Sequence, residues 1–132
     1  MAHGFVMDNW PSKSQRTYST TEQWTGDYWI DGKPIYRKVI ATTFPNSSKL
    51  LPIGESVDTI VSLRGIKVAQ NGEHYMFMGN GFPVAGQMWL IVVAYNNNAA
   101  TRANSIEILP KNGPGAWVGQ TVYLIVEFTL AD

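Results

Sequence analysis

Short runs of β-branched and aromatic residues recur along the chain, and turn-forming residues separate them. This composition, bounded by Gly, Pro and Asn, is typical of β-strands. No long stretch has the 3.6-residue apolar period of a helix. The spacing therefore predicts an all-β fold, a single antiparallel β-sandwich or jelly-roll-like domain. The predicted strands cover residues 36–44, 57–69, 74–78, 88–95, 105–109 and 121–130.

The alternation of apolar residues predicts which strand faces are buried. In the last strand every even position from Val122 to Leu130 is Val, Leu or Phe, which predicts one face on the core and one available to a neighbour. In the strand from Val57 to Val68 the apolar positions are first odd and then even. We therefore expect a β-bulge or a break at Gly65, where the buried face changes.

The run Met88–Tyr95 is apolar on both faces over its whole length. A strand covered by the second sheet on one side and by another subunit on the other would explain this pattern. The alternative is a central strand of a monomeric sandwich that lies under a long loop. The pattern alone does not separate these two interpretations.

A tight β-hairpin is predicted at Asp31-Gly32, which lies between two apolar and aromatic runs. This dipeptide is typical of the two-residue type I′ turn, in which both residues have positive φ. With that loop Ile30 pairs with Lys33 and Trp29 faces Pro34. Because Pro34 has no N–H, we expect its strand to begin along a sheet edge or at an irregular crossing.

Three blocks of sequence carry a resemblance to a known family. They are Tyr18-Ser19-Thr20, Glu22-Gln23, Gly26 and the run Trp29 to Lys38; then Leu51-Pro52-Ile53-Gly54, Val57–Val61 and Arg64-Gly65-Ile66; then Val122–Thr129. Together they resemble a small domain often found at the C-terminal ends of bacteriophage tail and receptor-binding proteins, and in prophage copies. The resemblance covers about residues 18–130. It implies a virion protein, in most such fibre tips a homotrimer.

Two features depart from that family pattern. The family usually has a small aliphatic residue where this chain has Trp24, and residues 72–103 show no clear match. Members are expected to vary in this middle part with their targets.

Composition and charge exclude several classes of partner. Ten basic and ten acidic side chains give zero formal net charge, so no field attracts the chain to nucleic acid or to an anionic membrane. The chain has no cysteine, which excludes disulfides, thiolate nucleophiles and cysteine metal sites. No signal peptide or membrane-spanning stretch is visible. These absences agree with assembly in the host cytoplasm and a final place on a virion, at the tail or the head surface.

The organisation predicted is an N-terminal arm, residues 1–17, followed by the β domain, residues 18–132. Phe5, Met7 and Trp10 are the candidates for anchoring the arm to other virion proteins or to a second copy. The alternative is a disordered terminus or the remains of a tag.

Catalytic and metal-binding signals are weak. The two histidines, His3 and His74, lie far apart in the sequence and no Ser has the glycines of a nucleophile elbow. We therefore expect no enzyme activity, no metal and no cofactor. A glycosidase would need two carboxylates across a cleft. Asp58, Glu73, Glu107 and Glu127 are available, but each also suits an exposed strand face or a turn.

Glycan binding is the stronger prediction, because aromatic rings and amide side chains recognise sugars and loops on a rigid scaffold carry binding residues. The leading hypothesis is a trimeric tail-fibre or baseplate tip module that contacts a host-surface polysaccharide. The alternative is a head fibre or capsid decoration protein held by its N-terminal arm, and a polysaccharide depolymerase ranks third. The candidate ligand-binding residues are Tyr75, Phe77, Asn80, Phe82, Asn97, Arg102 and Trp117.

Overall fold

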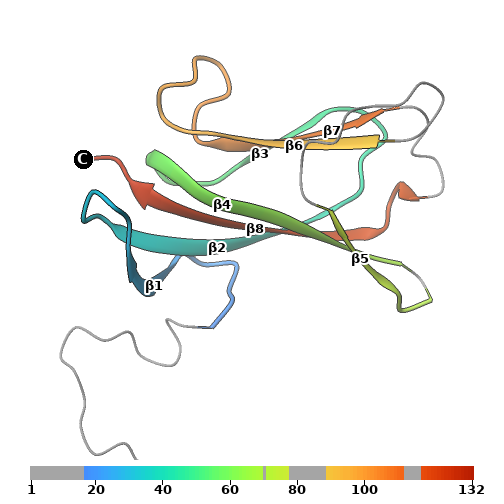
Figure 1. The fold of residues 1–132 in the computed structure, drawn as a ribbon. Helices are drawn as coiled ribbons and strands as arrows, with labels where there is room; N and C mark the ends of the chain where they lie inside the picture. Colours follow the sequence, from blue (N-terminus) through green and yellow to red (C-terminus); the bar gives the residue numbers. More distant parts are fainter. Residues whose placement is uncertain (1–16, 70, 78–88, 112–116) are drawn as a thin grey trace, which may run out of the picture.

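The computed structural model is a sandwich of two antiparallel β-sheets (Figure 1). It describes residues 17–69, 71–77, 89–111 and 117–132, and those ranges contain no α-helix. The larger sheet has the strand order β1-β2-β8-β4-β5, and the smaller has the order β3-β7-β6. The strands are β1 (Gln23–Tyr28), β2 (Pro34–Thr43), β3 (Lys49–Pro52), β4 (Val57–Val68), β5 (His74–Phe77), β6 (Trp89–Tyr95), β7 (Ser105–Lys111) and β8 (Thr121–Leu130).

The strands are connected in a jelly-roll-like order. The chain passes from the larger to the smaller sheet between β2 and β3 and again between β5 and β6, and it returns between β3 and β4 and between β7 and β8. The connections β2–β3 and β7–β8 thus join an antiparallel pair of the larger sheet, β2–β8, to an antiparallel pair of the smaller sheet, β3–β7, as in a jelly roll. The predicted fold class is confirmed. All six predicted strands are present, β1 is the first strand of the predicted hairpin, and β3 is an additional strand that the sequence pattern did not indicate.

The core lies between the two sheets and is built around β8. Val122, Leu124, Val126 and Phe128 are each 0% exposed, which confirms the predicted inner face of this strand. The other face is only partly open, because Ile125 is 6% and Thr129 0% exposed. Because β8 is flanked by β2 and β4, its even-numbered side chains occupy the centre of the larger sheet. The remaining buried members of the core are Phe44, Ile53, Val57, Val92, Ile106 and Ile108.

The predicted irregularity in β4 exists, but not at Gly65. The register between β4 and β8 is uniform from Ser62 to Val68, and the shifts lie between Val57 and Ser62. The sequence pattern misleads because an inner position is occupied by a lysine. Lys67 is only 1% exposed, so the odd positions stay buried and Ile66 lies on the outer face.

The strand that is apolar on both faces, β6, is an edge strand. Within the described residues its only partner is β7, with Val92 opposite Ile108. The interpretation as a central strand is therefore wrong. A covering second subunit stays a prediction, and an uncharged edge strand of this kind is suited to pair with another chain.

The β1–β2 hairpin has a three-residue loop instead of the predicted two. Trp29 N donates to Lys33 O at 2.9 Å, and Gly32 N donates to Trp29 O at 2.8 Å. Only Gly32 has a positive φ, 88°, whereas the type I′ turn needs two such residues. Asp31 instead accepts a hydrogen bond from Lys33 N on its Oδ1, at 3.0 Å, so the loop matches the three-residue type with Gly in the left-handed region.

This longer loop changes the predicted pairing. Tyr28, not Trp29, lies opposite Pro34. Pro34 is the first residue of β2, and pairing of β2 with β8 starts only at Tyr36. The missing N–H of Pro34 therefore removes no bond from the β2–β8 ladder, as expected for a proline at the beginning of a strand.

Candidate functional site

An open groove lined by aromatic rings lies beside the β1–β2 hairpin. Its volume is about 560 Å³. The strand β1 forms the edge of the larger sheet, on the side remote from the smaller sheet (Figure 1). Three rings and two polar side chains give the groove both apolar and hydrogen-bonding surface. Its lining residues are Glu22, Gln23, Trp24, Tyr28, Pro34, Tyr36 and Leu130.

The register of the hairpin brings the aromatic residues together. Trp24 lies opposite Tyr36 and Tyr28 lies opposite Pro34, so three residues of β1 face one residue of β2 between these pairs. Gly26, with φ of 91°, allows this irregularity. The rings of Trp24 and Tyr28 then meet edge to face, with centroids 5.8 Å apart.

Local hydrogen bonds hold the irregular part of β1 in place. The hydroxyl of Thr25 donates to Ile35 O at 2.8 Å and accepts from Asp27 N at 3.2 Å. The indole N–H of Trp24 donates to Asp27 O at 3.4 Å. These bonds fix the positions of the two rings relative to β2, so the groove is built on a strand pair and not on a free loop.

A pair of carboxyl groups stands at the rim of the groove. Glu22, which lines the groove, shares a hydrogen bond with Glu55 of the β3–β4 connection. Burial, that hydrogen bond and the neighbouring charge raise the pKa of Glu22 from its usual 4.5 to about 7, against a lowering effect of Lys38. The pair therefore holds a proton near neutral pH. The Lys38 amine itself donates to Ile53 O.

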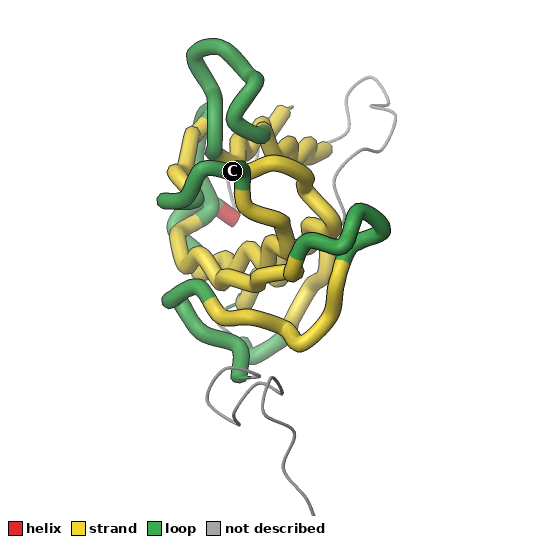
Figure 2. Tube along the Cα trace, turned by 90° about the vertical axis from the view of Figure 1, so that its left-hand side faces the viewer, coloured by secondary structure: helices red, strands yellow, loops and turns green. Residues whose placement is uncertain are grey.

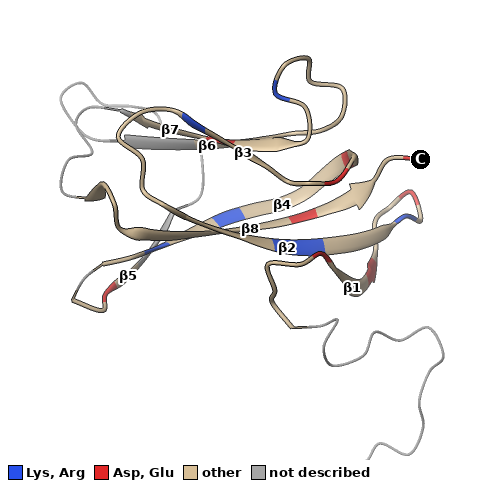
Figure 3. Ribbon diagram, turned by 180° about the vertical axis from the view of Figure 1, so that it is seen from behind, with Lys and Arg blue, Asp and Glu red and all other residues tan. Residues whose placement is uncertain are grey.

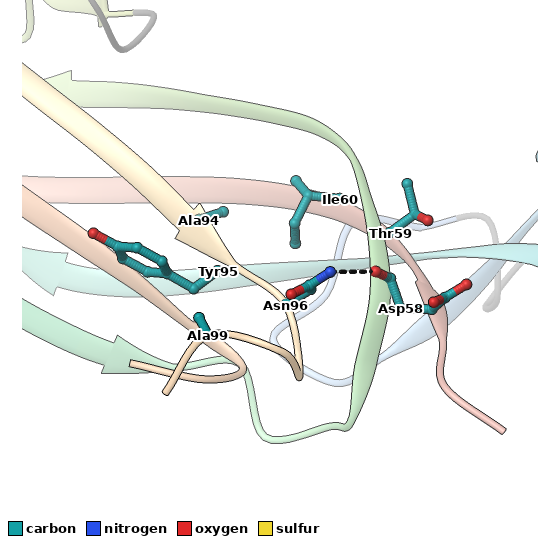
Figure 4. A pocket seen from close by; sticks show the side chains of 7 residues that line it. All are labelled: Asp58, Thr59, Ile60, Ala94, Tyr95, Asn96 and Ala99. Carbon is teal, nitrogen blue, oxygen red and sulfur yellow. Dashed lines mark hydrogen bonds between the residues drawn. The ribbon is translucent and has the colours of Figure 1, made fainter. Parts of the chain in front are cut away.

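A second, smaller hollow of about 340 Å³ lies between β4 and the connection after β6 (Figure 4). The side-chain amide of Asn96 donates to Asp58 O at 2.8 Å across it. Both hollows lie beside Lys33, whose amine donates to Asp58 Oδ2 at 3.0 Å and to Leu130 O at 3.2 Å. They therefore belong to the same end of the sandwich, the end that carries the C-terminus (Figure 2).

The predicted ligand residues Asn97 and Arg102 lie on the β6–β7 loop beside this smaller hollow. The side chain of Asn97 is exposed, and its backbone N donates to Val57 O at 2.8 Å. Arg102 Nε lies 3.2 Å from Glu107 Oε1. The hydroxyl of Tyr95 donates to the same oxygen at 2.8 Å, and this bond raises the pKa of Tyr95. The polar side chains of Asn96 and Arg102 thus hold the loop in place.

The other predicted ligand residues lie in several parts of the chain, some of them outside the described ranges. Trp117 packs edge to face on Phe44, with centroids 5.4 Å apart, and its ring lies 4.3 Å from the Lys67 amine. Tyr75 and Phe77 belong to β5. The described ranges do not include Asn80, Phe82 or the arm residues Phe5, Met7 and Trp10.

A polar cluster on the outer face of the larger sheet joins the three sequence blocks (Figure 3). Arg37 Nε lies 2.9 Å from Glu127 Oε2, and Ser62 donates to Glu127 Oε1 at 3.2 Å. Tyr18 covers this pair: the guanidinium of Arg37 is 4.1 Å from its ring centroid, and Arg64 donates to its hydroxyl at 2.6 Å. Residues far apart in sequence thus fix the first described residues to the sheet.

The carboxylates considered for glycoside hydrolysis have structural partners. Asp58 pairs with Lys33, Glu107 with Arg102 and Glu127 with Arg37. Glu73 lies in the turn before β5 and accepts a hydrogen bond from Asn71. In the described ranges no group of three or more His, Asp or Glu side chains is placed to hold a metal ion, and no helix there is long and apolar enough to cross a membrane.

Comparison of the chain with protein-family models, with curated proteins and with solved structures found no match.

The sequence analysis did not predict the aromatic groove, because it placed all candidate ligand-binding residues after the first block. The signal was present in Trp24, Tyr28 and Tyr36, which a hairpin must bring near each other. Recognising it required the correct register, because the two-residue loop predicted Trp29, not Tyr28, opposite Pro34.

Proposed function

We propose that this chain is a non-enzymatic β-sandwich module of a bacteriophage virion, which contacts a host-surface glycan through the groove beside β1 and β2. The observation that carries the glycan part is the convergence of Trp24, Tyr28 and Tyr36 on one open groove. The virion part rests on the resemblance of the three sequence blocks to phage tail and receptor-binding domains. In keeping with that resemblance, the module is a homotrimer.

The groove offers the two kinds of contact that sugars need. Aromatic faces pack against the C–H surfaces of a pyranose ring, and Gln23 and Glu22 supply amide and carboxyl groups to its hydroxyls. Tyr28 is 53% exposed, so its ring is accessible to a ligand. Trp24 is also the residue at which the first block differs from the family that it resembles. Such a difference is expected at a position that varies with the target.

The carboxyl geometry favours binding over hydrolysis. Glycosidases hold their two carboxyl groups about 5 Å or more apart so that a sugar or a water fits between them. Glu22 and Glu55 are instead close enough for Glu55 to raise the pKa of Glu22, which does not suit two groups that must stand on either side of a glycosidic bond. The groove therefore supports recognition without cleavage.

Glycan-array and host-cell binding test this function. Wild-type protein should bind a bacterial surface polysaccharide, and replacing Trp24→Ala together with Tyr28→Ala should weaken binding at least about tenfold, because stacked rings contribute about 1 kcal/mol or more each. Tyr123→Ala is the matched control, since Tyr123 is an exposed tyrosine on β8, away from the groove. Equal loss in the control, or full binding by the double variant, would reject the groove.

The alternative, a head fibre or capsid decoration protein, is favoured by one observation. The cluster around Tyr18 fixes the chain to the sheet at the point where the N-terminal residues join the domain. An arm attached to other virion proteins would therefore be joined to the domain at a fixed point. Deleting residues 1–17 should then abolish incorporation into particles and leave the trimer folded. Incorporation of the shortened chain would reject attachment through the arm.

A further inference from the structure

Acidic groups predominate around the aromatic groove. Glu22 lines it, and Glu55 is close enough to Glu22 to raise its pKa through a hydrogen bond and through its charge. Among the described residues, Lys38 is the cation that acts on this carboxyl pair, and its amine already donates to Ile53 O. Once the pair has lost its second proton, its two negative charges exceed the single charge of Lys38, so an acidic polysaccharide would meet repulsion and a cationic group would be attracted.

The aromatic lining of the groove also attracts cations. The faces of indole and phenol rings carry negative potential and attract ammonium groups, most strongly where water is excluded. Trp24, Tyr28 and Tyr36 stand along the same groove as Glu22. The other lysine near this end, Lys33, is paired with Asp58 at 3.0 Å, so its charge is largely balanced by its partner.

Resting on the glycan-binding function above, we propose that the groove selects glycans that carry a positively charged amino group. The ammonium lies against the Glu22–Glu55 pair, and the sugar ring that carries it packs on the aromatic side chains. The ligand class is thus an amine-bearing glycan, and neutral and acidic glycans bind more weakly.

The carboxyl pair makes this selectivity depend on pH. Around Glu22 the charged groups are Glu55, on the β3–β4 connection, and Lys38, on β2. Because the pair keeps its proton up to about pH 7, it gains full negative charge only above neutrality. A permanently charged ligand that binds only the ionised pair should therefore bind about tenfold more tightly at pH 8 than at pH 6.

The test uses two methyl glycosides, one of N,N,N-trimethylglucosamine and one of N-acetylglucosamine, titrated into the full chain at pH 6, 7 and 8 and followed by NMR. The trimethylammonium sugar keeps its charge at all three pH values, so any pH dependence belongs to the protein. We expect it to bind more tightly than the neutral sugar and to gain affinity with pH. Equal affinities, or no binding of the charged sugar up to about 10 mM, would overturn the proposal.

Two variants separate this proposal from the underlying function. Glu22→Gln removes the titrating carboxyl group, so it should abolish the pH dependence and lower the affinity for the charged sugar several-fold. Glu55→Gln removes the neighbouring charge but leaves the burial of Glu22, which is the largest cause of its raised pKa, so it should shift the pH dependence to lower pH. Trp24→Ala should weaken both sugars. Binding of the neutral sugar that depends on Trp24 but shows no preference for charge would leave glycan binding intact and refute the selectivity.

Discussion

The guanidinium of Arg37 lies 4.1 Å from the centroid of the Tyr18 ring, while Arg64 donates to the hydroxyl of the same tyrosine at 2.6 Å. Arg37 and Arg64 come from different strands, β2 and β4, on either side of β8. Between them Glu127 accepts from Arg37 at 2.9 Å. One tyrosine therefore ties the beginning of the described chain to β2 and β4, and through Arg37 indirectly to β8.

Replacing Tyr18 should loosen this attachment in two separable steps. Tyr18→Phe removes the hydroxyl bond to Arg64 but keeps the ring over Arg37, so it should lower the free energy of unfolding by about 0.5–1 kcal/mol. Tyr18→Ala also removes the ring and should cost about 1–2 kcal/mol. Urea unfolding measures both. Identical stabilities of Phe and Ala variants would mean that the ring contact contributes nothing.

Substitutions at Gly32 in the hairpin loop should change the stability of the fold through backbone conformation alone. Gly32 has φ of 88°, and an added Cβ would meet no heavy atom within 4 Å. Gly32→Ala should therefore cost about 1–2 kcal/mol through backbone strain, and Gly32→Asn should cost less because Asn tolerates this region better. Thermal unfolding compares the two. If Ala and Asn were equally harmless, the three-residue loop would be wrong.

Replacing the buried Lys67 and replacing its hydrogen-bond acceptor should lower the free energy of unfolding by different amounts. Lys67 is 1% exposed, and its amine donates to Gln120 Oε1 at 2.7 Å. Gln120→Leu removes an acceptor from a buried charge and should cost about 1–3 kcal/mol. Lys67→Met removes the charge and keeps the length, so it should cost less than about 1 kcal/mol. Chemical denaturation of both variants measures the difference, and the reverse order of stabilities would contradict this account.

The raised pKa of Glu22 predicts how stability varies with pH. Because the folded-state pKa is about 7 and the usual value is 4.5, the folded chain holds the proton more tightly than the unfolded chain does. This contribution is complete below about pH 4.5 and is lost as the pH rises through 7. Between pH 5 and 8 the Tm of the wild type should fall relative to that of Glu22→Gln, by on the order of 3 °C. Parallel Tm curves for the two proteins would exclude the shift.

The sequence was sufficient for the fold class and for most strands, because strand burial follows a simple alternation. The even positions of β8, from Val122 to Phe128, are fully buried as predicted. In β4 the alternation of apolar residues led to a wrong prediction, because the polar residue Lys67 occupies an inner, buried position. It also failed at β3, Lys49–Pro52, because four residues with a terminal proline carry too little pattern to identify a strand.

The candidate site was harder to predict because it depends on register. Trp24 and Tyr36 lie on different strands and become neighbours only through the pairing of β1 with β2. Tyr28 joins them because Gly26 allows two extra residues in β1, which composition cannot reveal. Glu55 comes from a separate connection, so its bond to Glu22 follows from the packing of the whole domain. Aromatic content alone had drawn the prediction to other residues, among them Trp117, which packs on Phe44.

NMR mapping of bound surface glycan tests the central claim, recognition through the groove, most directly. Oligosaccharides released from the polysaccharide that the protein binds would be titrated into isotope-labelled protein, with backbone amide and indole resonances followed. The account predicts the largest shifts at the Trp24 indole and around Tyr28 and Tyr36, with little change at Tyr123 on the outer face. Saturable shifts confined to the outer face or to the loop around Asn97, with Trp24 unaffected, would contradict it.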